Sequence, residues 1–220
     1  MMRAPMETKN PPVRHAAGEG APGLGATALR LTAGTGLPAL AVLVILLTLF
    51  APSPHLAHGI RPAFAFTVFS ALVLMTAAFA ASLAVTGPNF SPRPLFVWLP
   101  AALILAIGVA AELAFVPPQA WFVRMVGGNP LACFVSVFLL ALPVLIGALW
   151  ALRRSGSAQP RAAGAYAGLL AGAVSAGLFL LHCPESSLLY TLAWHVPAIV
   201  LVTALGAFAG ERLITPRSSR

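Results

Sequence analysis

The chain has very few charged side chains for its length. Only 8% of its 220 residues are charged, with no aspartate and a single lysine, whereas 59% are hydrophobic. A soluble domain is roughly one-quarter charged. This deficit excludes an ordinary soluble domain and indicates a membrane protein.

Cysteine is scarce, and several catalytic motifs are missing. Two cysteines are too few for a disulfide-rich scaffold, and without a CxxC motif the thioredoxin-like and quinone-linked disulfide exchangers lack their usual signature. The chain contains no glycine-rich phosphate loop after a strand, no serine–histidine–acid set and no paired aspartates. An ATP-driven enzyme or a membrane protease is therefore unsupported, and we expect the chain not to be an enzyme.

Six apolar runs are long enough to cross a bilayer, which takes about 20 helical residues. They lie at residues 31–51, 63–86, 95–116, 131–152, 162–181 and 188–209, separated by turns rich in proline and glycine. Because only helices satisfy the backbone in hydrocarbon at this hydrophobicity, the sequence predicts an all-α polytopic bundle of six transmembrane helices. Pro38, Pro143 and Pro197 fall inside these spans and should kink or loosen them.

The two ends of the chain differ in composition from the apolar middle. Residues 1–30 are rich in glycine, proline and alanine and predict a disordered cytoplasmic tail. Residues 31–209 form the expected transmembrane domain. Residues 210–220 are short and basic and should rest on the membrane surface.

The basic residues predict the orientation. Of the 13 lysine and arginine residues, all but Arg61 and Arg124 fall on the side of the predicted bundle that holds both termini. The positive-inside rule therefore places both termini in the cytoplasm. Because the arginines are scattered as topology signals, we expect contact with the lipid bilayer and no direct binding of nucleic acid.

Two cysteines fall at the same predicted depth. Cys133 stands near the start of the fourth span, and Cys183 lies in the outer connection between spans five and six, within His182-Cys183-Pro184-Glu185. We expect the two thiols to meet, either as a sensing or redox pair able to close a disulfide or as metal ligands together with His182. The alternative is that both cysteines are small buried hydrophobes.

Four other polar residues are expected to support this region: Glu112, His182, Glu185 and His195. A carboxylate within a span usually faces the bundle interior, a partner or water, so Glu112 is either protonated or paired with Arg124 or His195. For His195 we leave open a hydrogen bond to Glu112 or a backbone carbonyl and a role as a ligand.

Small residues recur every four positions in the fifth span. Gly164, Gly168 and Gly172, continued by Ala176, predict a face that another helix approaches closely. The stripe leaves open whether that helix belongs to the same chain or to a second copy in a homo-oligomer.

Taken together, these motifs resemble the NrsF family over roughly residues 60–213. The resemblance rests on a glycine-containing outer loop running into Cys133, on "LPVLIGALWALRR" at 142–154, on the glycine stripe, and on "LHCPESS" followed by Trp194. The family consists of six-span bacterial inner-membrane proteins that act as negative regulators (anti-sigma factors) of a SigF-type extracytoplasmic-function sigma factor.

The resemblance implies a function that composition could not supply. It implies that the chain sequesters a sigma factor at the cytoplasmic face and releases it on heavy-metal or oxidative stress. Cys133 and Cys183 match the two outer-face cysteines that are important for the family's response. No resident cofactor is expected beyond transient binding of a heavy metal. The alternatives are a membrane thiol redox enzyme or metal transporter that uses the same cysteines, and a structural membrane protein whose cysteines are inert.

Overall fold

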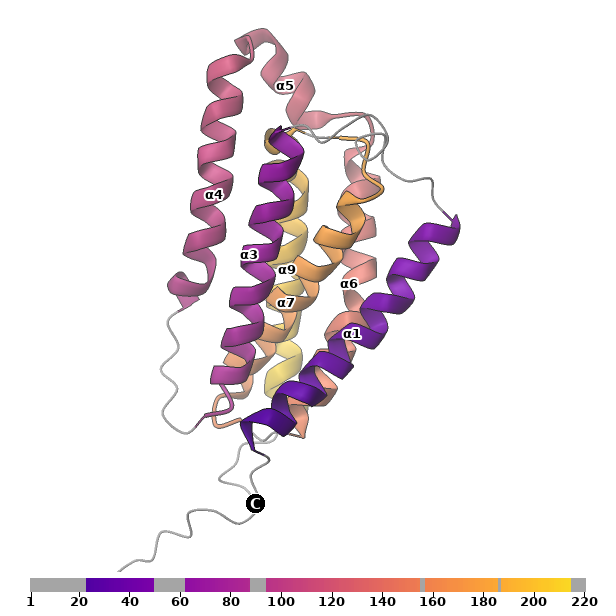
Figure 1. Cartoon of the computed structure of the whole chain (residues 1–220), viewed down its shortest axis with the longest axis vertical. Helices are drawn as coiled ribbons and strands as arrows, with labels where there is room; N and C mark the ends of the chain where they lie inside the picture. Colours follow the sequence, from indigo (N-terminus) through magenta and orange to yellow (C-terminus); the bar gives the residue numbers. More distant parts are fainter. Residues whose placement is uncertain (1–22, 50–61, 88–93, 155–156, 186, 215–220) are drawn as a thin grey trace, which may run out of the picture.

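The computed structural model describes residues 23–49, 62–87, 94–154, 157–185 and 187–214, and every regular element within these ranges is helical (Figure 1). Six helical segments are long and apolar enough to cross a membrane. They are α1 (Leu24–Leu49), α3 (Pro62–Ala84), α4 (Pro94–Phe115), α6 (Pro130–Arg153), α7 (Pro160–Leu180) and the continuous run of α8 (Leu188–Tyr190), η1 (Thr191–His195) and α9 (Val196–Leu213). The predicted all-α architecture with six candidate spans is confirmed.

Two boundaries differ from those expected. Helix α1 begins at Leu24 rather than at residue 31, because alanine and leucine in its first turns favour helix. Thr27, within these added turns, is buried. The remainder of the predicted tail, residues 1–22, lies outside the described residues. At the other end, α9 continues to Leu213 and Ile214 is buried, so part of the predicted basic tail belongs to the bundle. Residues 215–220 also lie outside the described part.

The connection between α4 and α6 contains a helix that the hydropathy pattern did not predict. Helix α5 (Pro118–Val126) starts at a proline in the first helical turn, where the missing N–H is no loss, and ends at Gly127. It caps one end of the bundle (Figure 1).

Helix α7 lies at the centre of the bundle. In its most apolar window, 78% of the residues are buried, compared with 22–33% in the other five candidate spans. It packs against α9, α6 and α3. The glycine stripe explains how α9 approaches so closely. A Cβ on Gly168 would lie 2.5 Å from the carbonyl oxygen of Val202, and one on Gly164 would clash with that of Gly206. The partner of the stripe is therefore α9 of the same chain, as small residues at a helix interface allow.

The bundle has two distinct ends (Figure 1). One end, which we call the basic end, holds the first residues of α1, α4 and α7 and the last residues of α3, α6 and α9. Its described basic residues are Arg30, Arg153, Arg154, Arg161 and Arg212. The opposite end, which we call the thiol end, holds α5, Cys133 and Cys183, and its one described arginine is Arg124.

The last span is locally loosened, as its proline predicted. Residues Thr191–His195 form a π-helical turn, in which the Val196 N–H bonds the carbonyl of Thr191. Pro197 has no N–H for the carbonyl four residues earlier, and its ring would clash with that carbonyl. Widening the preceding turn relieves the clash, and His195 is the last residue of the widened turn.

Candidate functional site

The two sulfur atoms lie in contact at the thiol end. Cys133, in the first turn of α6, and Cys183, just after α7, are both buried thiols whose Sγ atoms are 3.8 Å apart. The predicted proximity of the cysteines is therefore confirmed. The thiol contact with Cys133 and burial raise the pKa of Cys183.

His195 completes a group of three potential ligands. One nitrogen of its ring and the two sulfur atoms all lie within 4.8 Å of one another. The side chain is only 2% exposed, and neither ring nitrogen has a hydrogen-bond partner. The edge-on rings of Phe179 and Tyr190, with centroids 6.2 and 5.9 Å away, fix its orientation. We call Cys133, Cys183 and His195 the thiol–imidazole cluster.

His182, the ligand expected from its place beside Cys183, does not belong to this cluster. Its ring nitrogens are buried and also lack hydrogen-bond partners, but the three ligand atoms that the described residues bring together come from Cys133, Cys183 and His195. Adjacent residues on a chain that is leaving a helix point in different directions. His195, 13 positions after His182 and just before α9, takes the place assigned to His182.

The α5–α6 connection closes over the cluster. Gly127 has a φ of 63°, a conformation that favours glycine, and a Cβ there would lie 2.5 Å from the Tyr190 ring. The Gly128 N–H donates to Glu185 Oε1 at 3.0 Å, and the Tyr190 hydroxyl donates to the carbonyl of Asn129 at 3.2 Å. Glu185 therefore pins this connection and has no place among the three ligands.

Glu112 caps the last span. Its Oε2 accepts hydrogen bonds from the backbone N–H groups of Leu188 (2.6 Å) and Leu189 (3.2 Å). Its Oε1 accepts hydrogen bonds from the Ser187 hydroxyl (2.8 Å) and from Arg124 Nη1 (3.2 Å). A carboxylate at a helix N-terminus satisfies otherwise unpaired donors and meets the positive end of the helix dipole. Of the pairings expected for Glu112, the structure contains the one with Arg124 and not the one with His195.

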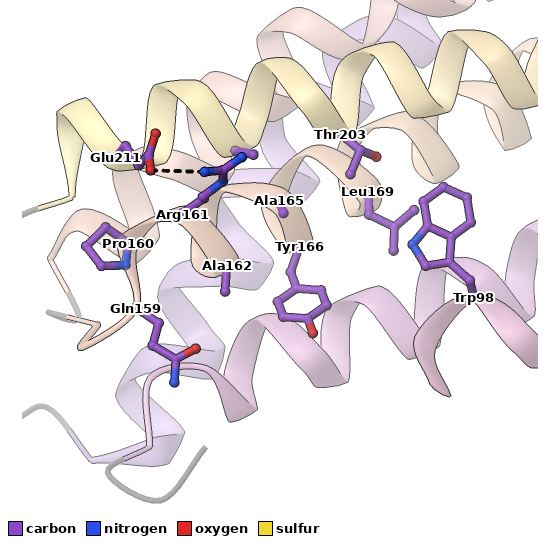
Figure 2. Close-up of a pocket in the computed structure, with 11 residues that line it drawn as sticks. Trp98, Gln159, Pro160, Arg161, Ala162, Ala165, Tyr166, Leu169, Thr203 and Glu211 are labelled. Carbon is purple, nitrogen blue, oxygen red and sulfur yellow. Dashed lines mark ion pairs between the residues drawn. The ribbon is translucent and has the colours of Figure 1, made fainter. Parts of the chain in front are cut away.

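Two cavities flank α7 and α9. One, of about 380 Å³, lies among α3, α4, α7 and α9, is almost entirely apolar, and has His195 on its wall. The other, of about 540 Å³, opens at the basic end beside the Arg161–Glu211 ion pair (Figure 2). Trp98 of α4 lines both. We call the second cavity the basic-end groove.

Comparisons with known proteins agree with the motifs. A family model described as "Negative regulator of sigma F" (NrsF) matches residues 16–215. The chain is 32% identical over 122 residues to a "Probable anti-sigma-F factor NrsF" from Azospira oryzae, a match spanning 53% of this chain and 57% of that protein. It is 35% identical over 83 residues to the "Anti-sigma-F factor NrsF" from Caulobacter vibrioides, spanning 38% of this chain and 39% of that protein.

The matched region thus spans little more than half of one curated relative and less than half of the other. No solved structure matches the chain. The family model covers most of the sequence, including both cysteines, the glycine stripe and the "HCPESS" segment. This chain therefore belongs to the NrsF family, the negative regulators of sigma F.

Proposed function

We propose that this chain is an inner-membrane anti-sigma factor that holds an extracytoplasmic-function sigma factor at the cytoplasmic face. Heavy metals or oxidants that react with Cys133 and Cys183 at the outer face cause release of the sigma factor. The single observation that carries the sensing role is the 3.8 Å contact between the two sulfur atoms, at the end of the bundle opposite most of the described arginines. With both termini in the cytoplasm, the basic end faces the partner and the thiol end faces the periplasm.

The α7–α9 pair supplies the link between the two faces. Cys183 follows directly on α7, and His195 directly precedes α9. At the other end of the same two helices, Arg161 and Glu211 form an ion pair with an N–O distance of 3.6 Å. A change in packing at the thiol end would therefore reach the basic end through two helices in backbone contact, shifting the population between a sigma-binding and a sigma-releasing arrangement.

The basic-end groove is the proposed docking surface for the sigma factor (Figure 2). Its floor is apolar, with Ala165, Tyr166 and Leu169 on α7, and Arg161 lines it beside Glu211. Further arginines end α6 and α9 at the same end of the bundle. This surface suits a sigma-factor segment with apolar side chains flanked by acidic ones. Ala165→Trp, which fills the groove, should reduce co-purification of the sigma factor at least tenfold, while Val200→Trp on the exposed face of α9 should leave it unchanged.

Orientation is tested with new cysteines, because the native thiols are too buried to label reliably. In a Cys133→Ser/Cys183→Ser background, Gln119→Cys on α5 and Ala158→Cys in the α6–α7 connection introduce exposed thiols at opposite ends. An impermeant maleimide added to intact cells whose outer membrane has been permeabilised should label the first and not the second. The reverse pattern would contradict the orientation and, with it, sensing from the periplasm.

Function is tested by deletion and by the double cysteine variant. Deleting the gene should raise transcription of the genes controlled by the sigma factor without stress. Cys133→Ser/Cys183→Ser should keep repression but lose induction by Cd²⁺ or oxidant. A deletion that leaves every stress-induced transcript unchanged would refute the anti-sigma function, and full induction in the double variant would refute sensing by these thiols.

A further inference from the structure

We propose that the thiol–imidazole cluster is a three-ligand binding site for one soft divalent d¹⁰ cation, such as Cd²⁺ or Zn²⁺, with His195 as the third ligand. This inference deepens the proposed function and rests on it only for the biological consequence of binding. The site itself consists of Cys133, Cys183 and His195.

The chemistry of the donors selects the cation. Two sulfur atoms and one imidazole nitrogen lie within 4.8 Å of one another, and each of the three side chains is buried. Thiolate and imidazole favour soft or borderline ions over Mg²⁺ and Ca²⁺, which prefer oxygen. Glu112 and Glu185 are engaged by backbone N–H groups, so no carboxylate joins the set.

The unpartnered imidazole is the observation that points to a ligand. A buried polar group normally has a hydrogen-bond partner, and leaving it without one costs free energy. His195 has no partner at either ring nitrogen, although it lies beside two thiols and is held in place by aromatic rings on two sides. A cation bound at one nitrogen would satisfy it.

The sulfur geometry already suits a bound ion. Two thiolates on a tetrahedral ion with metal–sulfur bonds of about 2.3 Å lie about 3.8 Å apart. The Sγ atoms of Cys133 and Cys183 are separated by 3.8 Å. The thiols therefore need little rearrangement, and the adjustment falls mainly on His195.

Charge selects a divalent ion over a monovalent one. Binding replaces the two thiol protons by the cation: M²⁺ plus two R–SH plus imidazole gives M(S–R)₂(imidazole) and two H⁺, with no change of oxidation state. The resulting complex is neutral. With a monovalent ion such as Cu⁺ it would carry one negative charge, which is costly in a buried site without a cationic partner.

Binding also connects three helices. Cys133 is on α6, Cys183 follows α7, and His195 precedes α9. Coordination would draw atoms that now lie within 4.8 Å into a tighter group and so pull the ends of these helices together. Oxidation to a disulfide would join only the two cysteines and leave His195 out, so the two signals would act on different sets of helices.

The test uses the purified full-length protein in nanodiscs, titrated with Cd²⁺ and followed by the ultraviolet thiolate-to-cadmium charge-transfer band. The wild-type protein should bind one Cd²⁺ per chain. His195→Ala should weaken binding at least tenfold, and either Cys133→Ser or Cys183→Ser should remove most of the band. His182→Ala is the matched control, because it removes the neighbouring buried imidazole outside the cluster, and it should change the affinity by less than about twofold.

A folding defect is separated from a lost ligand by His195→Met, which supplies a neutral soft donor at the same position and keeps the complex neutral. This variant should regain part of the Cd²⁺ affinity that His195→Ala loses. An unchanged affinity in His195→Ala, or equal losses in His195→Ala and His182→Ala, would overturn the assignment of His195. A wild-type protein with no charge-transfer band would overturn the site as a whole.

The binding test contains no sigma factor, so its failure is distinct from failure of the proposed function. If Cd²⁺ binds as described but does not release the sigma factor from the membrane complex, the site stands and the sensing function fails. If induction by Cd²⁺ survives in His195→Ala, the proposed function stands and the role of His195 in the response to Cd²⁺ fails.

Discussion

The two ends of the α7–α9 pair are built on opposite principles. At the thiol end, Glu112 makes four hydrogen bonds, the α5–α6 connection is pinned by Glu185 and Tyr190, and the cluster beneath is buried. At the basic end, the two helices are joined by an ion pair whose side chains are 76% and 50% exposed, beside an open groove of about 540 Å³. The proposed sensing site thus lies where packing is complete, and the proposed docking surface lies where it is not.

The largest effect is expected from disrupting the contact between α7 and α9, which connects the two ends. Gly168→Leu places a side chain against the backbone of α9 at Val202 and should destabilise the fold by about 3 kcal/mol or more. We expect loss of the monodisperse protein on size-exclusion chromatography in detergent. Gly177→Ala in the same helix is the control, because its Cβ would meet only Ala71 at 4.0 Å and should leave the elution unchanged. Equal behaviour of the two variants would contradict the role of the α7–α9 contact.

A smaller effect is expected from uncapping the last span. Glu112→Ala leaves the N–H groups of Leu188 and Leu189 without an acceptor in a largely buried position and should cost about 2–3 kcal/mol. The melting temperature in detergent should fall clearly. Glu112→Gln keeps one oxygen acceptor, so its melting temperature should fall by less. If Glu112→Ala melted like the wild type, the capping role would be wrong.

A single hydrogen bond at the thiol end sharpens the comparison further. Tyr190→Phe removes the hydroxyl that donates to the carbonyl of Asn129 while keeping the ring against His195, and should cost about 1 kcal/mol. The measurement is thermal unfolding, together with faster hydrogen exchange in the α5–α6 connection. Unchanged exchange there would mean that the bond does not hold the connection closed.

The smallest effect is expected at the basic end. Arg161→Ala breaks an ion pair that is largely exposed, and such pairs add little stability. Its melting temperature should match that of the wild type, whereas its binding of the sigma factor should weaken if the basic-end groove is the docking surface. A large loss of stability would show that the two ends are more alike than the contacts suggest.

Much of this architecture could be read from the sequence. Hydropathy gave the six spans because bilayer thickness fixes their length, and the four-residue glycine period identified the contact face of α7 before its partner was known. The proximity of Cys133 and Cys183 could be predicted because both residues adjoin loops at the same end. The predicted loosening at Pro197 appeared as the π-helical turn.

Three features could not be predicted from the sequence: the third member of the thiol–imidazole cluster, helix α5 and the cap made by Glu112. His182 was preferred over His195 as a ligand because it adjoins Cys183 in the sequence, but the π-helical turn brings His195 to the sulfurs instead. Helix α5 was missed because its nine residues are too short to give a span signal. The cap made by Glu112 was missed because its donors lie more than 70 positions away.

The glycine contact has a mechanical consequence. Helix α7 has 21 residues and is therefore about 32 Å long. At Gly164 and Gly168 its backbone lies directly against that of α9, so at these positions no side chain separates the two helices. Two helices in such contact should move together as one rigid unit. A displacement of a fraction of an ångström at the residues that flank them at the thiol end would then change the tilt of both helices at the basic end.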